Sequence, residues 1–396
     1  MKVVVVTGFT PTPENTRGIS GLLYAILKYR PEYIDLKIIS FNFNKISIEQ
    51  IKELEKDLQS SIMIQRPPRW VFFFNNIWGW RFNKFFMSEP LECSYVSKSL
   101  IKNVRKEHPD LIWCYPYFFY RLANKMPDMK VVLSGCDCEA LINVRKFVTK
   151  SCLKGTKALR HTYIMLKRGL HFESRWNEPN LKIHFVGEED KCFYERVYGY
   201  HNAYFIRHPH YSLHDKEVNF NKPKLKVIMT GGYDIYTEDD VDMMLPNLIK
   251  YNDELHLLFE FTILGKNWEP LKRKFEACGF ECTFKTWVDD YAQELVQHDI
   301  QIAPISYGTG TKGKVLSALG NGLLVVGSKF AFENIEVVTQ ESCVQYQKAS
   351  DVAELLLKIA YEKDKYQAIA LKGRAQVRNY HNPKIISKEF FETYGR

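Results

Sequence analysis

The first half of the chain alternates short apolar runs with amphipathic segments. Residues 3–6, VVVV, are apolar at every position, as expected of a strand buried on both faces of a sheet. Apolar residues then recur at 19, 22, 23, 26 and 27, the spacing of one helix face. Residues 34–40 predict the next strand, so the chain opens with a strand–helix–strand unit and a parallel sheet. Further strands are predicted at 111–114, 131–133 and 183–186.

The same alternation restarts at residue 225. A helix is predicted over residues 241–249, although Pro246 should kink or shorten it, and another over 352–360. Strands are predicted at 225–229, 259–264, 281–285, 300–305 and 323–326.

A polar, proline-containing segment, residues 215–224, separates the two series. We therefore predict an N-terminal domain over 1–214, a linker over 215–224 and a C-terminal domain over 225–378. A length of 396 residues also favours two domains. The expected fold class is α/β, with two doubly wound domains in tandem.

Charge is distributed unevenly between the halves. Residues 1–222 hold 34 Lys and Arg against 22 Asp and Glu, whereas residues 223–396 hold 21 against 24. A basic first half and a slightly acidic second half indicate different partners for each. Basic surface is typical of proteins that bind anionic membranes, phosphorylated substrates or nucleic acid.

Cysteine use and hydropathy indicate a cytoplasmic protein. No run approaches the about 18–20 apolar residues that span a bilayer, and the run at 3–6 is too short for a signal peptide. The nine cysteines are odd in number and form no CxxC pair, which favours reduced thiols.

The most informative stretch is residues 303–327, APISYGTGTKGKVLSALGNGLLVVG. It predicts a strand, a glycine-rich loop, a short helix and a second strand. Glycines allow backbone N–H groups to approach a ligand, and a helix N-terminus favours an anion. Lys312 and Lys314 add full positive charges, so the stretch predicts a diphosphate site.

Two other interpretations of this loop remain. Gly308, Gly310 and Gly313 spell GxGxxG, the dinucleotide fingerprint, with Glu333 about 20 residues further on. That fingerprint normally follows the first strand of its unit, and lysines are not part of it. The loop could also be a structural turn with two solvated lysines.

The second half resembles the C-terminal domain of GT-B glycosyltransferases, especially family-four-like enzymes. The resemblance is collinear over most of residues 225–378 and rests on MTGGYDIYTEDDVDMML, FTILGKNW, TFKTWVDDYAQELVQHDIQIAPI and GTGTKGKVLSALGNGLLVVGS. The first half is similar more loosely, through VVVVTGFTPTPENTRG and LSGCDCEAL. The resemblance implies two Rossmann-like domains facing across a cleft, with a final helix, in 379–396, that crosses back to the N-terminal domain.

Several positions depart from the family-four pattern. Thr309 and Ser317 stand where the family usually has two glutamates, and Cys136 stands where a histidine is expected before Asp137. These departures put a retaining outcome in doubt. Inverting GT-B enzymes, including membrane-associated glucuronosyltransferases of exopolysaccharide assembly, also lack that pair, keep a loop lysine and use an N-domain aspartate as base. Lys314 and Asp137 match those two roles.

The resemblance assigns roles to further residues. Asp137 is the candidate general base, with Glu139 in reserve, although Asp137 could instead cap the next helix. Trp287 and Tyr307 are candidate nucleotide contacts or core residues, and Arg17 and Gly18 are candidate acceptor contacts or solvated loop residues. The donor would be bound by Gly231, Gly232, Lys266, Trp287, Tyr307, Gly310, Thr311, Lys312, Lys314 and Ser317.

An aromatic and basic stretch, residues 66–86, reads RPPRWVFFFNNIWGWRFNKFF. Basic residues also run through 145–168. Aromatic side chains beside cations suit a lipid headgroup interface, so we expect peripheral contact with an anionic membrane. Alternatively, the aromatics pack inside the domain or on an oligomer face. No nucleic-acid-binding motif is found, and no nucleic-acid partner is expected.

The expected function is transfer of a hexose from a nucleotide-diphosphate sugar to a saccharide acceptor, lipid-linked, in surface polysaccharide assembly at the inner face of the cell membrane. The nucleotide sugar is a co-substrate. No cofactor and no metal are expected, because lysines and a helix end can stabilise the leaving diphosphate. The alternatives are a GT-B-like sugar-nucleotide epimerase and a non-catalytic nucleotide-sugar-binding subunit.

Overall fold

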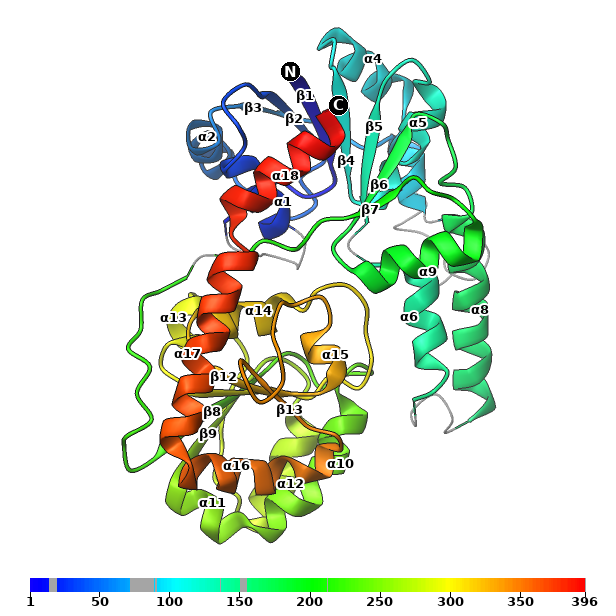
Figure 1. Ribbon diagram of the computed structural model, residues 1–396. Helices are drawn as coiled ribbons and strands as arrows, with labels where there is room; N and C mark the ends of the chain where they lie inside the picture. The colour runs from blue at the N-terminus through cyan, green and yellow to red at the C-terminus, as the bar shows by residue number, and fades with distance from the viewer. Residues whose placement is uncertain are drawn as a thin grey trace. The chain divides into compact units, whose positions relative to one another are not determined.

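Two compact units make up the chain in the computed structural model, which describes residues 1–13, 20–71, 89, 91–135, 137–149, 155–211 and 213–395. The first unit comprises Met1–Val144, Leu159–Tyr211 and Pro383–Arg396. The second comprises Arg145–Ala158 and Ser212–Asn382. Each unit has its own parallel sheet and its own hydrophobic core (Figure 1).

The first unit is built on a seven-stranded sheet in the order β3-β2-β1-β4-β5-β6-β7, with every pair parallel. Val4 and Val6 of β1 pack into one core cluster, and Val3 and Val5 pack into another. The all-apolar run therefore predicted a doubly buried strand correctly. The strands are β1 (Lys2–Thr7), β2 (Asp35–Ser40), β3 (Ser61–Ile64), β4 (Leu111–Tyr115), β5 (Val131–Gly135), β6 (Leu181–Phe185) and β7 (Ala203–Phe205).

Helices cover both faces of this sheet. They are α1 (Ser20–Lys28), α2 (Ile48–Asp57), α4 (Lys98–Lys106), α5 (Arg121–Lys125), α6 (Glu139–Lys146), α8 (Thr156–Glu173), α9 (Glu188–Tyr198) and α18 (Pro383–Gly395), with short 3-10 turns at Leu91–Tyr95 and Tyr117–Phe119.

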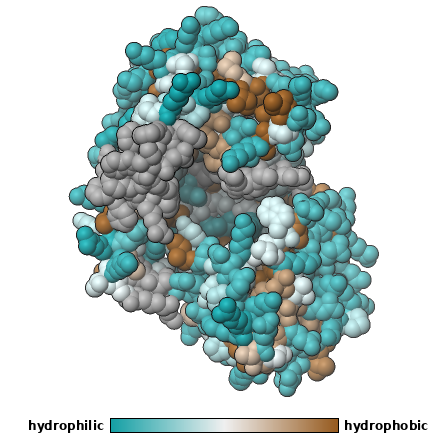
Figure 2. Space-filling view, turned by 180° about the vertical axis from the view of Figure 1, so that it is seen from behind, coloured by the Kyte–Doolittle hydropathy of each residue, from teal (hydrophilic) through white to brown (hydrophobic). Residues whose placement is uncertain are grey.

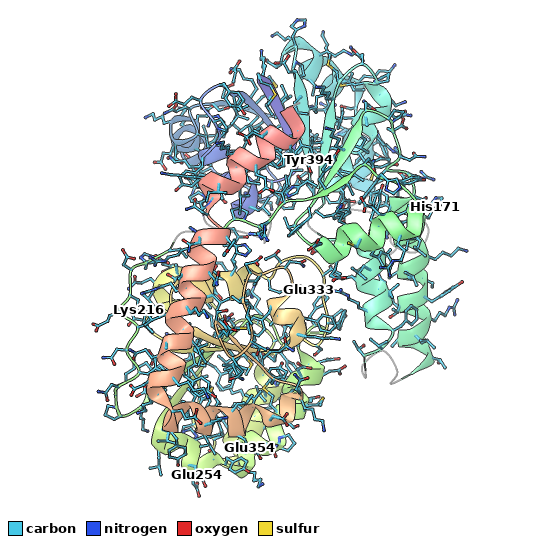
Figure 3. All side chains as sticks on the ribbon, in the orientation of Figure 1. His171, Lys216, Glu254, Glu333, Glu354 and Tyr394 are labelled. Atoms are coloured by element: carbon cyan, nitrogen blue, oxygen red, sulfur yellow. The ribbon has the colours of Figure 1, made fainter. Side chains whose placement is uncertain are left out.

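The last helix, α18, packs in the first unit although it ends the chain. The ring of Phe390 lies 4.2 Å from that of Trp113 on β4, and Ser387 Oγ donates to the carbonyl of Ile26 on α1 at 2.7 Å. Tyr394, labelled in Figure 3, is also buried there. Burial of these aromatic rings holds the two ends of the sequence together in one core.

The second unit is built on a six-stranded parallel sheet in the order β10-β9-β8-β11-β12-β13. Together with the first sheet, it confirms the expected α/β class. The strands are β8 (Leu225–Thr230), β9 (Phe259–Leu264), β10 (Thr283–Lys285), β11 (Ile300–Ala303), β12 (Leu324–Gly327) and β13 (Val344–Gln345).

Helix α10 runs from Glu238 to Lys250 and contains Pro246 in its interior, so the proline does not end it. Its apolar face packs on the sheet through Val241, Met244 and Leu248. The other helices of this unit are α11 (Asn252–Leu258), α12 (Glu269–Cys278), α13 (Tyr291–Leu295), α14 (Gly313–Gly320), α15 (Lys329–Phe332), α16 (Val352–Tyr361) and α17 (Lys363–Tyr380), with a 3-10 turn at Ala349–Asp351.

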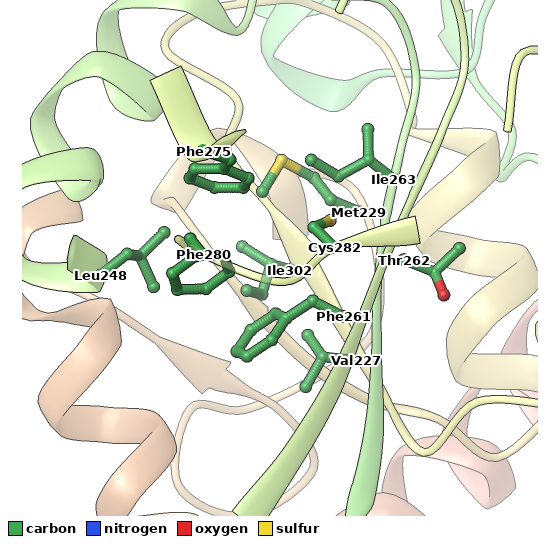
Figure 4. Close-up of a pocket in the computed structure, with 10 residues that line it drawn as sticks. All are labelled: Val227, Met229, Leu248, Phe261, Thr262, Ile263, Phe275, Phe280, Cys282 and Ile302. Carbon is green, nitrogen blue, oxygen red and sulfur yellow. The ribbon is translucent and has the colours of Figure 1, made fainter. Parts of the chain in front are cut away.

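A small apolar space lies inside this core, between the sheet and helices α10 and α12 (Figure 4). Phe275 and Phe280 line one side of it, and Met229 and Ile302 come from strands. Thr262 is the only lining residue with a polar side-chain oxygen or nitrogen. The space therefore belongs to the packing of the core and offers little for binding a charged ligand.

Three strands were not predicted from the sequence: β3, β7 and β13. All three lie at an edge of their sheet and have two to four residues. Short edge strands bury few side chains, so they leave a weak apolar pattern. Several helices, among them α2, α4, α8, α12 and α17, were also not predicted. No helix of the described residues is long and apolar enough to cross a membrane.

Candidate functional site

Three glycine-containing loops of the second unit lie at the carboxyl ends of the adjacent strands β9, β8 and β11. Strand β8 ends at Thr230 and β11 at Ala303, and these strands are neighbours although four helices and two strands separate them along the chain. The strand order reverses at this pair, because β9 and β10 lie on one side and β12 and β13 on the other. Ligands of open α/β sheets bind at such a switch point.

Two of these loops are locked together by their backbones. Gly231 N–H donates to Leu264 O at 2.9 Å, and Tyr233 N–H donates to Lys266 O at 3.0 Å. The indole of Trp268 donates to Gly231 O at 2.8 Å. A Cβ on Gly265 would fall 1.6 Å from that same oxygen, and Gly265 has φ +148°. Only glycine fits at this position.

The third loop, which follows β11, is tied to the first. Ser306 N–H donates to Tyr236 O at 2.8 Å, and Asp240 N–H donates to Ser306 Oγ at 3.1 Å. The rings of Tyr236 and Tyr307 lie 5.1 Å apart. These contacts place the glycine loop after β8 beside the glycine-lysine loop after β11.

The side chain of Lys312 forms hydrogen bonds within its own loop. Its ammonium donates to the carbonyls of Thr309 at 2.6 Å and Gly310 at 3.1 Å. A Cβ on Gly308 would lie 2.9 Å from Lys312 Cε. Lys312 therefore stabilises the loop conformation, and Gly308 leaves room for its side chain.

Lys314 lies in the first turn of α14 and points toward the other loop. Its Nζ is 3.4 Å from the position that a Cβ would take on Gly231. Across the part of the chain that the structure describes, its ammonium makes no hydrogen bond or ion pair. The residue is exposed as a whole, but protein packed around the ammonium lowers the pKa of Lys314, and the carboxylate of Asp234 opposes that shift.

The N-terminus of α14 adds positive potential at the same place. The residue before the helix, Lys312, makes no side-chain capping bond, and the first turn holds no acidic residue. The partial positive charge of the helix end is therefore not offset by a local carboxylate. A lysine, a helix end and glycine backbones form an arrangement that suits a phosphate group.

The other predicted donor residues differ in accessibility. Lys266 follows β9 and is exposed, and Trp287 follows β10 with 71% of its surface exposed, which does not fit the alternative of a core tryptophan. Tyr307 and Ser317 are buried, at 1% and 4% exposed, and present little surface to a ligand. Gly232, Gly310 and Thr311 lie in the loops described above.

Thr309 has a buried hydroxyl in the glycine-lysine loop. The residue is 5% exposed, and its Oγ1 has no hydrogen-bond partner among the described residues. An unpaired buried hydroxyl is costly unless a ligand or water satisfies it.

The candidate base Asp137 lies in the first unit, in the turn between β5 and α6. The helix that follows is capped by other carboxylates: Asp190 accepts from Cys138 N–H at 2.6 Å, and Glu173 accepts from the N–H groups of Glu139 and Ala140 at 2.6 and 3.2 Å. The sequence left open that Asp137 caps this helix, but Asp190 and Glu173 bind these three amides instead. Arg17, Gly18 and Cys136 lie outside the described residues.

The acidic residue that the dinucleotide interpretation requires, Glu333, is bound in an ion pair. Both oxygens of Glu333, labelled in Figure 3, accept from the guanidinium of Arg145, at 2.6 and 2.7 Å. The glycine loop also follows β11, which is not the first strand of its unit. The sequence analysis missed this ion pair and the Asp234–Lys314 interaction, because neither leaves a spacing signal.

Within the described residues, no group of three or more His, Cys, Asp or Glu side chains is placed to hold a metal ion. Operation without a metal stays a prediction.

The comparisons with known proteins agree with this architecture. Residues 224–361 match the family model described as "Glycosyl transferases group 1". This segment contains Gly231, Lys266, Lys314 and the strands that carry them. No curated protein matches the sequence.

Solved structures match over nearly the whole chain. The HepE protein of Anabaena in complex with UDP-glucose is 11% identical, with a TM-score of 0.64 and 99% of each chain covered. Sucrose-phosphate synthase from Thermosynechococcus elongatus is 10% identical, with a TM-score of 0.66, covering 100% of this chain and 98% of its own. WaaG, a glycosyltransferase involved in lipopolysaccharide biosynthesis, is 12% identical, with a TM-score of 0.61, covering 97% and 98%. The chain therefore has the fold of the GT-B glycosyltransferases, and residues 224–361 of its second unit match the model of group 1 glycosyl transferases.

Proposed function

We propose that this protein transfers a sugar from a nucleoside-diphosphate sugar to a saccharide acceptor. The observation that carries the proposal is the position of Lys314 at the N-terminus of α14. Its ammonium points toward Gly231 and makes no hydrogen bond or ion pair within the described residues. The group 1 family match over 224–361 and the UDP-glucose named with HepE support a nucleotide sugar as the ligand.

In the proposed reaction the acceptor hydroxyl attacks C1 of the donor sugar, and the bond from C1 to the diphosphate oxygen breaks. The nucleoside diphosphate leaves with added negative charge, which Lys314 and the α14 N-terminus stabilise. Gly231 and Gly232 allow the backbone to approach the phosphates, and Trp287 offers an exposed ring to the nucleobase. Asp137 takes the proton of the acceptor hydroxyl. We expect transfer to proceed in the presence of a chelator.

The acceptor is proposed to be lipid-linked and to belong to surface polysaccharide assembly. The lipopolysaccharide biosynthesis named with WaaG supports this class of acceptor, as does the basic first half of the chain. The stretch expected to meet the membrane, residues 66–86, falls mostly outside the described residues.

Helix α8 has an exposed surface that suits contact with an anionic membrane. Residues 140–172 contain no Asp or Glu and eight Lys and Arg. On α8, Arg160, Tyr163 and Lys167 share one exposed face, with Tyr163 60% exposed. Figure 2 shows a different feature of the surface: on the face that it displays, hydrophobic residues form only small groups within a mostly hydrophilic surface. Cations beside an exposed aromatic ring suit a headgroup layer.

Calorimetry with UDP, GDP, ADP, CMP and NAD tests the donor proposal. Saturable binding of one nucleoside diphosphate is the expected result, and a preference for NAD would overturn it. The corresponding nucleotide sugars are then tested for transfer to saccharide acceptors with and without membrane vesicles. Nucleotide binding without turnover under all of these conditions would identify the chain as a binding subunit instead.

A further inference from the structure

A buried carboxylate that the proposed reaction does not use lies directly behind the turn that carries Asp137. Glu173, the last residue of α8, is 0% exposed. It accepts four hydrogen bonds: from Glu139 N–H at 2.6 Å, Ala140 N–H at 3.2 Å, Cys138 Sγ at 3.3 Å and Tyr198 Oη at 3.0 Å. Three of these donors belong to the three residues that follow Asp137.

A second buried carboxylate completes this support. Asp190 of α9 is also 0% exposed and accepts from Cys138 N–H at 2.6 Å. The backbone N–H groups of residues 138, 139 and 140 are therefore all bound to carboxylates from elsewhere in the unit. Negative charge at a helix N-terminus is favourable, and hydrogen bonds to charged groups are stronger than neutral ones.

The backbone of α8 is shaped for this contact. Gly169 lies one turn before Glu173, on the same side of the helix. A Cβ on Gly169 would lie 3.0 Å from Ala140 N and 3.3 Å from Ala140 Cα, so a side chain there would require α8 and the start of α6 to separate by a few tenths of an ångström. The glycine permits the close approach that brings the Glu173 carboxylate within reach of the Glu139 and Ala140 amides.

We propose that Glu173, assisted by Asp190, is a positioning residue that fixes the turn between β5 and α6 and with it the carboxylate of Asp137. This rests on the proposed function as far as the reaction is concerned. The hydrogen-bond pattern supports it, because a carboxylate that accepts four donors holds the turn more rigidly than a local side-chain cap with a single bond.

The electrostatics of Glu173 fit this role. Burial raises the pKa of Glu173 to about 7, while its hydrogen bonds with Cys138, the Ala140 backbone and Tyr198 act in the opposite direction and Glu139 raises it further. A raised pKa means that burial of the ionised Glu173 lowers the stability of the folded unit, although four hydrogen-bond donors surround it. Buried ionisable groups with shifted pKa values are common at functional sites.

The experiment compares Glu173→Gln with Glu189→Gln, which removes an exposed carboxylate from α9. Hydrogen exchange of the peptide over residues 137–142 is the first readout. We expect exchange of the Glu139 and Ala140 amides to become about tenfold faster in Glu173→Gln and to stay unchanged in Glu189→Gln. Unchanged exchange in a folded Glu173→Gln protein would overturn the proposal.

Steady-state kinetics with the donor chosen by calorimetry is the second readout. In Glu173→Gln, kcat should fall about tenfold with the donor KM unchanged, because the donor loops lie in the other unit. An unchanged kcat alongside faster exchange would overturn the positioning of Asp137. If wild-type protein transfers no sugar at all, the proposed function fails, while the exchange experiment still decides whether Glu173 holds the turn.

Two further variants apply if Glu173→Gln does not fold. Tyr198→Phe removes one of the four donors and should give a smaller effect in the same direction on both readouts. Gly169→Ala keeps every carboxylate but should push α8 from α6 by a few tenths of an ångström, and we expect it to make exchange faster by less than Glu173→Gln does. Wild-type exchange in both variants would also overturn the proposal.

Discussion

The ammonium of Lys314 lies 3.4 Å from the position at which Gly231 would carry a Cβ. Gly231 lies in the loop after β8 and Lys314 in the first turn of α14, after β11, so a positive charge lies next to bare backbone. This relationship predicts that Lys314→Ala weakens binding of the preferred nucleoside diphosphate at least about tenfold, because a charge-assisted contact is lost. Lys358→Ala, on α16 in the same unit, is the matched control. Equal affinities of both variants and wild type in calorimetry would remove Lys314 from the site.

Gly265 should tolerate no side chain. Its Cβ would meet the Gly231 carbonyl at 1.6 Å, and its φ is +148°. We expect Gly265→Ala to lower the free energy of unfolding by about 2–5 kcal/mol, because overpacking and backbone strain add. Gly279→Ala is the control: Gly279 also has a positive φ, +68°, but nothing lies within 4 Å of its Cβ position. If urea unfolding shows the same loss of unfolding free energy for both variants, backbone strain alone, and not the contact between the loops, makes glycine necessary at position 265.

Asp137→Asn should separate binding from transfer. An amide cannot take the acceptor proton, so we expect kcat to fall at least about 100-fold while calorimetric affinity for the donor nucleotide is unchanged. Asp128→Asn changes an exposed carboxylate of the same unit that pairs with Arg105 and should leave turnover unaffected. Normal turnover by Asp137→Asn would exclude it as the base and direct attention to Glu139.

His184 should make the first unit sensitive to acid. Trp113 Nε1 donates to Ser134 Oγ, which donates to His184 Nδ1, and His184 Nε2–H donates to the Ile206 carbonyl. Burial lowers the pKa of His184 to about 4. The unfolded chain binds a proton near pH 6.5 and the folded chain does not, so stability is lost as pH falls from 6.5 toward 4.

Between pH 7.5 and 5 this loss should be about 2 kcal/mol. His184→Gln keeps one donor and one acceptor without titrating, and its unfolding free energy should change less over the same pH range than that of wild type. His201→Gln, at an exposed position, should follow wild type. Parallel pH profiles for all three proteins in urea unfolding would contradict the assignment.

Vesicle binding tests the exposed face of α8. Wild-type protein should float with phosphatidylglycerol-containing vesicles, less so at high salt, and not with neutral phosphatidylcholine vesicles. Replacing Lys157, Arg160 and Lys167 by Glu should reduce binding about a hundredfold. Replacing Lys329, Lys348 and Lys358 by Glu changes the net charge equally in the second unit and is the control. The same reduction in both triple variants would show that net charge, and not this face, drives binding.

The sequence by itself determined the α/β class and the place of the glycine-lysine loop between a strand and a helix. Doubly buried strands such as residues 3–6 need an unbroken apolar run, and a phosphate loop needs glycines next to a helix start, so both leave local signals. The four strands that lie in the middle of the second sheet were all predicted within two residues, because most of their side chains are buried and leave an apolar run in the sequence.

Only the tertiary structure decided what each charged residue of the site does. Lys312 and Lys314 are two residues apart in one motif, yet one binds loop carbonyls and the other points toward Gly231. Glu173, 36 residues from Asp137, accepts from the first amides of the helix for which Asp137 was the alternative cap. Hydrogen bonds and ion pairs of this kind join residues far apart in the chain, and they depend on how close the backbones approach, which no spacing in the sequence records.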